Sequence, residues 1–254
     1  MGAYNAMLWR NAIALSLILP VFLWRRIPWP ERSVLKLHVW RGLIVSVMAF
    51  LFFWGLAHVP LAEAIALSFI APLIALYLAA AILKERITRS AIGASLAGLM
   101  GALIIVGGKL SGDYGDTVLA GIVAILASAV MYAYNLILQR QQALRAGPVE
   151  IALFQNATVV SVYLLLAPFL AVVPSPDIVP TLAGAAVLGL GSILLLSWAY
   201  ARAEAKVLLP VEYTAFIWAA LLGWLIYAET LTLTTLVGTA LIVGGCLLAA
   251  RQHP

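Results

Sequence analysis

The stretch from Glu63 to Gly108 reads EAIALSFIAPLIALYLAAAILKERITRSAIGASLAGLMGALIIVGG. It begins as an apolar run that is broken by Pro72 and ends at Glu85, within the tetrapeptide Leu-Lys-Glu-Arg. A second apolar run follows at once and carries Gly93 and Gly101. We therefore expect a helix that ends at an acidic residue, followed by a glycine-containing helix.

The same pattern returns near the C-terminus. There an apolar run is broken by Pro210 and ends at Glu229, and Gly238 and Gly245 follow this acid at almost the same spacing as in the first copy. Self-similarity of this kind is the sequence signature of an internal repeat.

Composition restricts what the repeat can build. Of the 254 residues, 65% are hydrophobic and 10% are charged, whereas a soluble domain carries about 25% charged residues. The mean hydropathy is +1.08. These values predict an all-α polytopic membrane protein, because the long apolar runs lack strand-like alternation and lipid offers no partner for unpaired backbone groups. The single cysteine, Cys246, forms no CxxC pair, so neither a disulfide framework nor a metal or other cofactor is expected.

A helix needs roughly 20 apolar residues to cross a bilayer, and on this basis nine spans are predicted. Their expected ranges are Asn5–Trp24, Val39–Ala57, Leu61–Leu83, Ser90–Gly108, Val118–Leu138, Val149–Val173, Val179–Tyr200, Val207–Ala228 and Leu231–Ala250.

Basic residues predict the orientation of these spans through the positive-inside rule. Most of the 15 Lys and Arg residues fall in alternate loops and at the tail, namely Arg25, Arg26, Arg32, Lys36, Arg41, Lys84, Arg86, Arg89, Arg140, Arg145, Arg202, Lys206 and Arg251. The opposite loops carry Lys109 and the acids Glu63, Asp113, Asp116, Asp177 and Glu229. We therefore expect the C-terminus in the cytoplasm and the N-terminus outside. The net charge of +5 follows from this topology and gives no reason to expect a nucleic-acid partner.

Under this orientation the third and eighth spans cross the membrane in opposite directions, so the repeat is inverted. Trp54 and Trp198 end matching stretches of the second and seventh spans, and the first span pairs with the sixth. The fifth span has no partner, which predicts repeats of residues 1–110 and 111–254 with four and five helices. Many secondary transporters build their two access states from inverted repeats around a site near the midplane.

Taken together, several features resemble the EamA family of the drug/metabolite transporter superfamily. They are Arg10 early in a span, the Pro72 helix that ends in Leu-Lys-Glu-Arg, the Gly93 and Gly101 spacing, and the stretch from Pro210 to Glu229. The resemblance implies ten helices in two five-helix repeats and the transport of small organic metabolites across the bacterial inner membrane. This chain departs from that pattern in lacking the first helix. Either the helix lies upstream of Met1, which we favour, or it has been lost.

Two charged residues are the main candidates for binding the transported substrate. Arg10 lies early in a span, where a charge is costly unless it faces a cavity or a partner. It could bind a carboxylate or phosphate, although it could also snorkel to the outer interface. Glu212 follows Pro210, which opens the helix locally, so it could carry a proton or bind a cationic substrate. Alternatively, Glu212 pairs with Lys206 or Arg202 at the cytoplasmic end of its span.

Four polar or aromatic residues could add contacts to the substrate, although bundle packing is an alternative role for each of them: Tyr132, Asn135, Tyr213 and Trp218. Four others are candidates for structural or gating roles: Pro72, Glu85, Pro210 and Glu229. Glu85 and Glu229 end helices, where the helix dipole disfavours a negative charge. We therefore expect each of them to have a specific partner.

Other functional classes fit the sequence less well. The histidines His38, His58 and His253 are expected in loops and at the tail, and the sequence contains no HExxH, GxSxG or P-loop motif. A passive channel is the alternative, and a membrane-embedded enzyme is more remote. We expect a transporter of an amino-acid-like, vitamin, nucleoside-like or drug-like solute, with export favoured. The sequence leaves open proton coupling and whether the working unit is a monomer or a homodimer.

Overall fold

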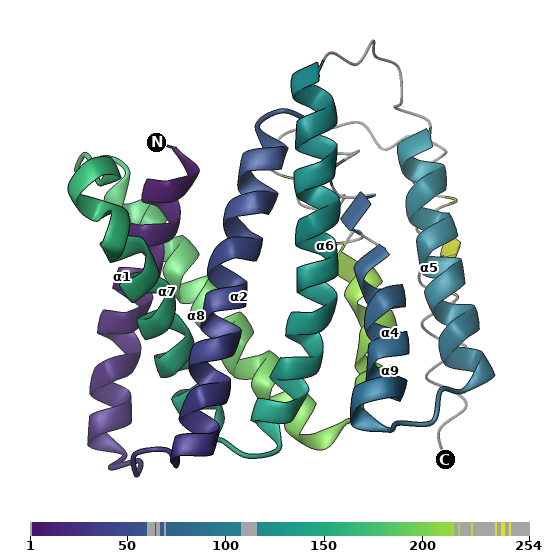
Figure 1. Ribbon diagram of the computed structural model, residues 1–254, viewed down its shortest axis with the longest axis horizontal. Coiled ribbons are helices and arrows are strands. Elements are labelled where there is room, and N and C mark those ends of the chain that lie inside the picture. The colour runs from purple at the N-terminus through teal and green to yellow at the C-terminus, as the bar shows by residue number, and fades with distance from the viewer. Residues whose placement is uncertain are drawn as a thin grey trace. The chain divides into compact units, whose positions relative to one another are not determined.

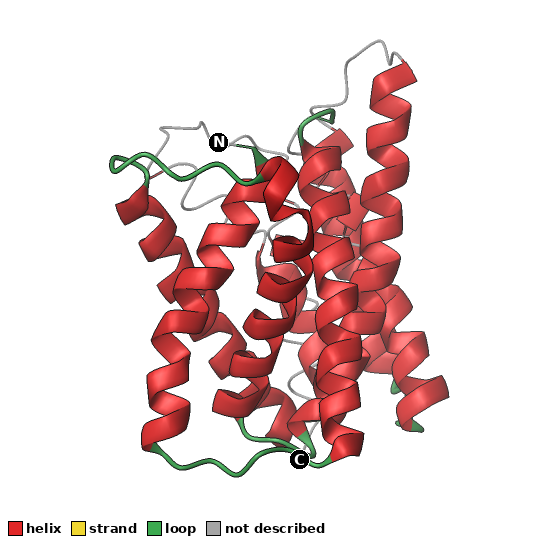
Figure 2. Cartoon of the chain, turned by 60° about the vertical axis from the view of Figure 1, so that its left-hand side comes forward, coloured by secondary structure: helices red, strands yellow, loops and turns green. Residues whose placement is uncertain are grey.

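All regular elements in the described part of this computed structural model are helices (Figure 2). The structure describes residues 2–59, 64, 67, 68, 70–107, 116–215, 218, 225, 237, 240, 241 and 244. The elements are α1 (Ala3–Trp24), α2 (Arg32–Leu56), α4 (Ile70–Leu83), α5 (Arg89–Gly107), α6 (Asp116–Ala143), α7 (Pro148–Leu170), α8 (Val179–Arg202), α9 (Ala205–Leu208) and the 3₁₀ helix η1 (Leu209–Tyr213).

Five of these helices are long and apolar enough to cross a membrane: α1, α2, α6, α7 and α8. Apolar side chains cover much of their outer surface. On α8, for example, Leu188 is 77% exposed and Leu195 is 70% exposed, which is the surface that lipid would cover. The expectation of an all-helical polytopic membrane protein is confirmed. The count of nine spans stays a prediction, because α4 is shorter and most of the ninth span lies outside the described residues.

The second span starts earlier than expected. α2 begins at Arg32, well before the predicted start at Val39. His38 and Arg41 made this region look like a loop, but both lie inside α2 and are buried, with exposed fractions of 0% and 2%. The expectation that His38 and Arg41 lie in loops is therefore wrong. A hydropathy argument assumes that polar side chains are hydrated, whereas these two side chains bind other buried polar groups instead of water.

The eighth span is interrupted as the proline suggested. The short helix α9 ends at Leu208 and continues as the 3₁₀ helix η1, which contains Pro210. Proline lacks a backbone donor, and 3₁₀ geometry is a common way to accommodate a break of this kind. The acids Glu63 and Glu229 lie outside the described residues, so their expected roles remain predictions.

The chain divides into two compact units. Unit 1 contains Met1–Phe53 and Leu138–Arg202, and unit 2 contains Trp54–Ile137 and Ala203–Pro254. Each unit therefore combines segments from both halves of the sequence. The repeat boundaries at residues 1–110 and 111–254 stay a prediction.

In unit 1, α1 and α7 lie side by side and run in opposite directions (Figure 1). At one end, Asn5 Nδ2 donates to the Leu170 carbonyl over 3.2 Å, which joins the start of α1 to the end of α7. At the other end, the Phe22 and Phe154 rings meet edge to face at 6.4 Å, near the end of α1 and the start of α7. This antiparallel pair forms the core of unit 1.

In unit 2, the last turn of α2 meets the first turns of α6 through two glycines. A Cβ added at Gly55 would lie 2.6 Å from Ile125 Cγ1 and 2.9 Å from the Gly121 carbonyl oxygen. A Cβ at Gly121 would lie 2.8 Å from Val59 Cγ2. Small residues at such a crossing let two backbones approach closely.

Candidate functional site

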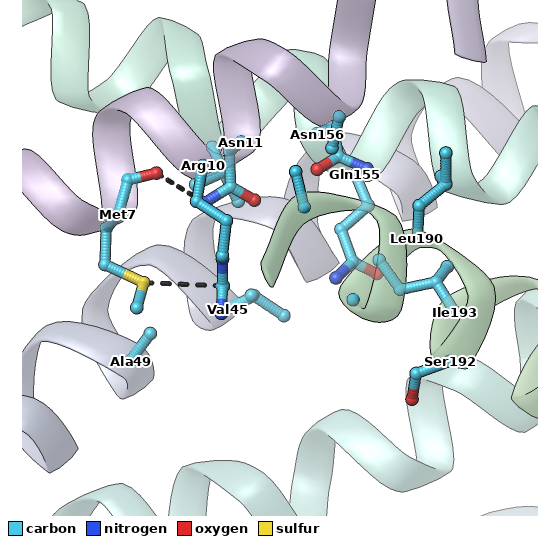
Figure 3. Close-up of a pocket in the computed structure, with 14 residues that line it drawn as sticks. Met7, Arg10, Asn11, Val45, Ala49, Gln155, Asn156, Leu190, Ser192 and Ile193 are labelled. Atoms are coloured by element: carbon cyan, nitrogen blue, oxygen red, sulfur yellow. Dashed lines mark hydrogen bonds between the residues drawn. The ribbon is translucent and has the colours of Figure 1, made fainter. Parts of the chain in front are cut away.

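A pocket with several polar lining residues lies inside unit 1, between α1, α2, α7 and α8 (Figure 3). Its volume is about 170 Å³. Val45, Ala49, Leu190 and Ile193 are among its apolar lining residues, and its polar lining residues are Arg10, Asn11, Gln155, Asn156 and Ser192. A mainly apolar wall with a few converging polar groups is typical of small-molecule sites.

Arg10 brings the positive charge to this pocket. It lies about two turns into α1, is partly buried, and extends toward Val45 (Figure 3). Its Nη2 donates to the Met7 sulfur over 3.5 Å, which is a weak interaction. Within the part of the chain that the structure describes, Arg10 forms no ion pair, and the pocket lining contains no Asp or Glu. The guanidinium is therefore available to bind an anion.

The two asparagines of the pocket are held in the same way. Asn11 Nδ2 donates to the Met7 carbonyl over 2.7 Å, and Asn156 Nδ2 donates to the Ala152 carbonyl over 2.8 Å. Each amide thus uses one N–H within its own helix, so its oxygen can accept from a ligand and its second N–H can donate to one. The neighbouring Gln155 Oε1 is buried and has no hydrogen-bond partner among the described residues.

These polar residues occupy matching places in the sequence. Trp-Arg-Asn-Ala at residues 9–12 of α1 corresponds to Phe-Gln-Asn-Ala at residues 154–157 of α7, and the same offset relates the first residues of the two helices. Arg10 thereby corresponds to Gln155, and Asn11 to Asn156. From the sequence we paired the first span with the sixth but did not identify Gln155 and Asn156 as site residues. Their sequence signal is that two adjacent amide side chains lie inside an apolar run.

The walls of the pocket follow the same correspondence. Val45 and Ala49 of α2 match Gly189 and Ile193 of α8 at the offset that relates Trp54 to Trp198, and all four line the pocket. Equivalent helices of the two sequence halves therefore contribute equivalent positions to one pocket.

Two other predicted residues meet in unit 2. The Tyr132 hydroxyl of α6 donates to Glu212 Oε2 of η1 over 2.7 Å. The alternative pairing of Glu212 with Lys206 or Arg202 is not seen. Lys206 pairs with Glu204, and in unit 1 the Arg202 guanidinium lies 4.4 Å from the centre of the Trp198 ring.

The remaining candidates contribute less to a defined site. Asn135 is buried one turn after Tyr132 on α6, with 4% exposure, whereas Trp218 is 60% exposed. Pro72 is buried near the start of α4. The side chains of Pro210 and Tyr213 are outside the described residues. Their suggested roles stay predictions.

Glu85 has the specific partner that its place at a helix end led us to expect. Its two carboxylate oxygens accept hydrogen bonds from the backbone N–H groups of Ala205 and Lys206, each at 3.1 Å. These groups open α9, where the helix dipole favours a negative charge. Lys84 turns the chain just before Glu85, with a left-handed φ of 58°. The Leu-Lys-Glu-Arg motif thus caps the helix that precedes Pro210.

Sequence reasoning missed a buried polar network in unit 1. Arg41 donates to Gln142 Oε1 over 2.7 Å and to Gln139 Oε1 over 2.9 Å. Gln142 Nε2 lies 2.9 Å from His38 Nδ1, and His38 Nε2 lies 3.0 Å from Glu150 Oε1. Because Arg41 requires the oxygen of Gln142, the Gln142 nitrogen donates to His38 Nδ1. The other ring nitrogen of His38 then carries the hydrogen and donates to Glu150.

This network explains why α6 continues to Ala143, beyond the predicted end at Leu138. It ties the last turns of α6 to the first turns of α2 and α7, and hydrogen bonds join five buried polar side chains there. Arg140, also expected in a loop, lies in the last turn of α6 and donates to the Tyr200 carbonyl of α8. Among the described residues, no cluster of three His, Cys, Asp or Glu side chains could hold a metal ion.

Comparison with known families supplies the wider context. The model of the EamA-like transporter family matches residues 1–107 and 119–251. One relative is the pseudopaline exporter CntI of Pseudomonas aeruginosa UCBPP-PA14, 29% identical over 213 residues that span 83% of this chain and 73% of the exporter. Another is a riboflavin transporter of Brucella anthropi, 26% identical over 253 residues that span 96% of this chain and 86% of the relative.

A third relative, an uncharacterized transporter of Helicobacter pylori J99, is 26% identical over 82% of this chain and 71% of its own length. Among solved structures, one crystal structure of a protein matches 100% of this chain and 90% of its own with a TM-score of 0.85. Its sequence identity is 20%, so this match shows the fold alone.

Proposed function

Because the chain belongs to the EamA-like transporter family, a family of transporters and not of enzymes, we propose that it is a secondary transporter that moves a small organic solute by alternating access. The chain is a multi-pass membrane protein. We place it in the bacterial inner membrane, with the C-terminus in the cytoplasm and the N-terminus outside, on the positive-inside distribution of its basic residues.

One observation carries this proposal. The antiparallel helices α1 and α7 contribute Arg10, Asn11, Gln155 and Asn156 to a single pocket. Two helices that match in sequence and run in opposite directions are what an inverted repeat of four and five helices requires. A polar site between such helices supports a carrier, which opens alternately to each side, over a channel.

The relatives support the substrate class and the direction of transport. One is an exporter of pseudopaline and another is a transporter of riboflavin. By likeness to these relatives, we propose a small organic solute for the present chain, with export as the direction.

Transport would draw its energy from a gradient, either of protons or of the solute itself. The described part of unit 2 offers Glu212, which is hydrogen-bonded to Tyr132, as a candidate proton carrier. Carboxylates within membrane segments are costly and mark proton or substrate pathways in many transporters.

Solute counterflow in proteoliposomes tests this function. The purified chain is reconstituted and the vesicles are preloaded with one unlabelled amino acid, nucleoside, vitamin or organic cation at a time. A carrier accumulates the labelled solute transiently above equilibrium only when its unlabelled form is inside. Equilibration at the same rate with or without preloading would show a passive channel and would contradict the proposal.

Replacing Arg10 by alanine tests the site within the same assay. We expect Arg10→Ala to lose counterflow by about tenfold to a hundredfold, because a charge-assisted hydrogen bond is worth about 1.5–3 kcal/mol. Arg25→Ala removes an exposed arginine at the end of α1 and serves as the matched control. Full counterflow by Arg10→Ala at equal membrane abundance would show that the pocket is not the transport site.

A further inference from the structure

We propose that the pocket of unit 1 holds its solute between two repeat-equivalent polar pairs, with Arg10 binding a carboxylate and Gln155 binding an uncharged, hydrogen-bonding end of the same molecule. This assignment rests on the proposed function, since it identifies the solute class and the residue that selects it. Gln155 is thus the specificity-determining counterpart of Arg10.

The first argument is positional. Arg10 and Asn11 occupy the same places in α1 that Gln155 and Asn156 occupy in α7. The two helices pack together and run antiparallel, and both asparagines donate to a carbonyl one turn earlier in their own helix. The local structures are therefore equivalent, and the two sides differ where one has arginine and the other has glutamine.

The second argument concerns charge. Arginine offers only donors, in a planar fork that fits a carboxylate with two parallel hydrogen bonds. None of the lining residues, all of which the structure describes, is an Asp or Glu that could neutralise Arg10. A solute that brings one carboxylate would supply the missing partner, whereas an organic cation would be repelled.

The third argument concerns the opposite side of the pocket. Gln155 Oε1 is buried without a donor among the described residues, which costs about 1–3 kcal/mol of desolvation if nothing fills the role. The oxygens of Asn11 and Asn156 are further acceptors among the lining residues. An amine or hydroxyl of the solute would satisfy such oxygens, whereas a second carboxylate would find no second cation, because Arg10 is the one charged residue in the described lining.

The size of the pocket limits the solute. Its volume of about 170 Å³ is roughly ten times the ~15 Å³ needed to hold one water. A carboxylate, a few carbon atoms and a polar group fit in this space. The geometry thus favours a small monocarboxylate that carries a hydrogen-bond donor away from its carboxylate.

An exchange of the two residues tests the inference. We compare the wild-type chain, Arg10→Gln, Gln155→Arg, and the double exchange Arg10→Gln with Gln155→Arg. L-glutamine is the monocarboxylate probe, L-glutamate is the dicarboxylate and putrescine is the diamine. Binding is measured as thermal stabilisation of the detergent-solubilised chain, and transport as counterflow in proteoliposomes.

We expect the wild-type chain to bind L-glutamine about tenfold more tightly than L-glutamate and to show no stabilisation by putrescine. Arg10→Gln should weaken L-glutamine binding by about tenfold to a hundredfold. The double exchange should recover at least about tenfold of this loss, because equivalent positions swap roles. Gln155→Arg alone should shift the preference toward L-glutamate, because it adds a second guanidinium.

Each outcome separates the inference from the proposed function. A double exchange that binds no better than Arg10→Gln, while it elutes and melts like wild type, overturns the inference even if counterflow is intact. If the variants fail to fold, the thermal stabilisation of the wild-type chain tests the inference. Stabilisation by L-glutamate or putrescine that equals or exceeds that by L-glutamine would overturn it. If the solutes bind in the predicted order and the double exchange recovers binding, but no counterflow is measured, the site is retained and the transport function is overturned.

Discussion

In unit 2, the hydroxyl of Tyr132 donates a hydrogen bond of 2.7 Å to Glu212 Oε2, and this bond joins α6 to the 3₁₀ helix η1. Glu212 lies two residues after Pro210, where 3₁₀ geometry replaces the α-helix. Among the described residues, the Glu212 carboxylate has this hydrogen bond and no ion pair, so it can exchange a proton without breaking a salt bridge there. The pair is therefore the feature of unit 2 best suited to coupling transport to protons.

Replacing Glu212 by glutamine should separate coupling from exchange. Glutamine cannot carry a proton, so we expect accumulation driven by an imposed pH gradient to be lost, while counterflow of the solute continues. Both assays use the same proteoliposomes. Tyr132→Phe should have a smaller effect, since it removes one hydrogen bond worth about 1.5–3 kcal/mol to a charged acceptor.

Tyr77→Phe is the control for this pair, because Tyr77 lies in the same unit on α4 and is 62% exposed. It should leave both assays unchanged. Undiminished gradient-driven accumulation in Glu212→Gln would remove Glu212 as the proton carrier.

The buried network of unit 1 should contribute to stability through Gln142. Leucine at this position removes the acceptor of Arg41 and the donor to His38, and both partners remain buried. We expect Gln142→Leu to lower the free energy of unfolding by about 1–3 kcal/mol, which is the cost of an unsatisfied buried polar group. Thermal unfolding in detergent measures the effect.

Gln141→Leu provides the matched comparison, because it changes the same residue type at the next position of α6, which is only partly buried. It should shift the melting temperature little. Equal shifts for Gln141→Leu and Gln142→Leu would show that the network adds no stability.

The cap made by Glu85 gives a further prediction. Glu85→Ala removes both acceptors from the N–H groups of Ala205 and Lys206. By analogy with other helix caps, the loss should cost about 0.5–2 kcal/mol of stability. Glu85→Gln should cost less, because its amide oxygen can still accept one of the two hydrogen bonds. It should still cost something, because the charge that complements the helix dipole is gone.

Hydrogen exchange at the start of α9 would report on this cap directly. We expect faster exchange at Ala205 and Lys206 in Glu85→Ala than in wild type. Asp177→Asn, which alters an exposed acid in another loop, serves as the control. Unchanged exchange in Glu85→Ala would mean that the carboxylate does not hold these groups in solution.

Gly42 should be the most sensitive point of the contact between α2 and α7. A Cβ added there would lie 2.5 Å from Thr158 Cβ, which is part of a helix and cannot move aside cheaply. We expect Gly42→Ala to cost about 1–3 kcal/mol, the usual penalty of overpacking. Gly184→Ala on α8, where an added Cβ would meet nothing within 4 Å, should be neutral or slightly stabilising in the same thermal assay. A wild-type melting temperature in Gly42→Ala would contradict the close approach.

Sequence alone determined that this chain is helical and membrane-spanning, because hydropathy and helix length are local properties of each segment. It also identified the family, and it paired the first span with the sixth. The ends of α2 and α6 escaped this reasoning because His38, Arg41 and Gln142 look like loop residues until their mutual hydrogen bonds are seen.

Only the tertiary structure decided which polar side chains meet. Arg10 and Glu212 were both evident as charges in apolar runs, yet nothing local shows that Arg10 shares a pocket with Gln155 or that Glu212 is bonded to Tyr132. The partner of Glu85 was expected but could not be named, because it is the start of a helix more than a hundred residues away. Such contacts depend on how distant helices pack, and the apolar periodicity of a single helix carries no information about its neighbours.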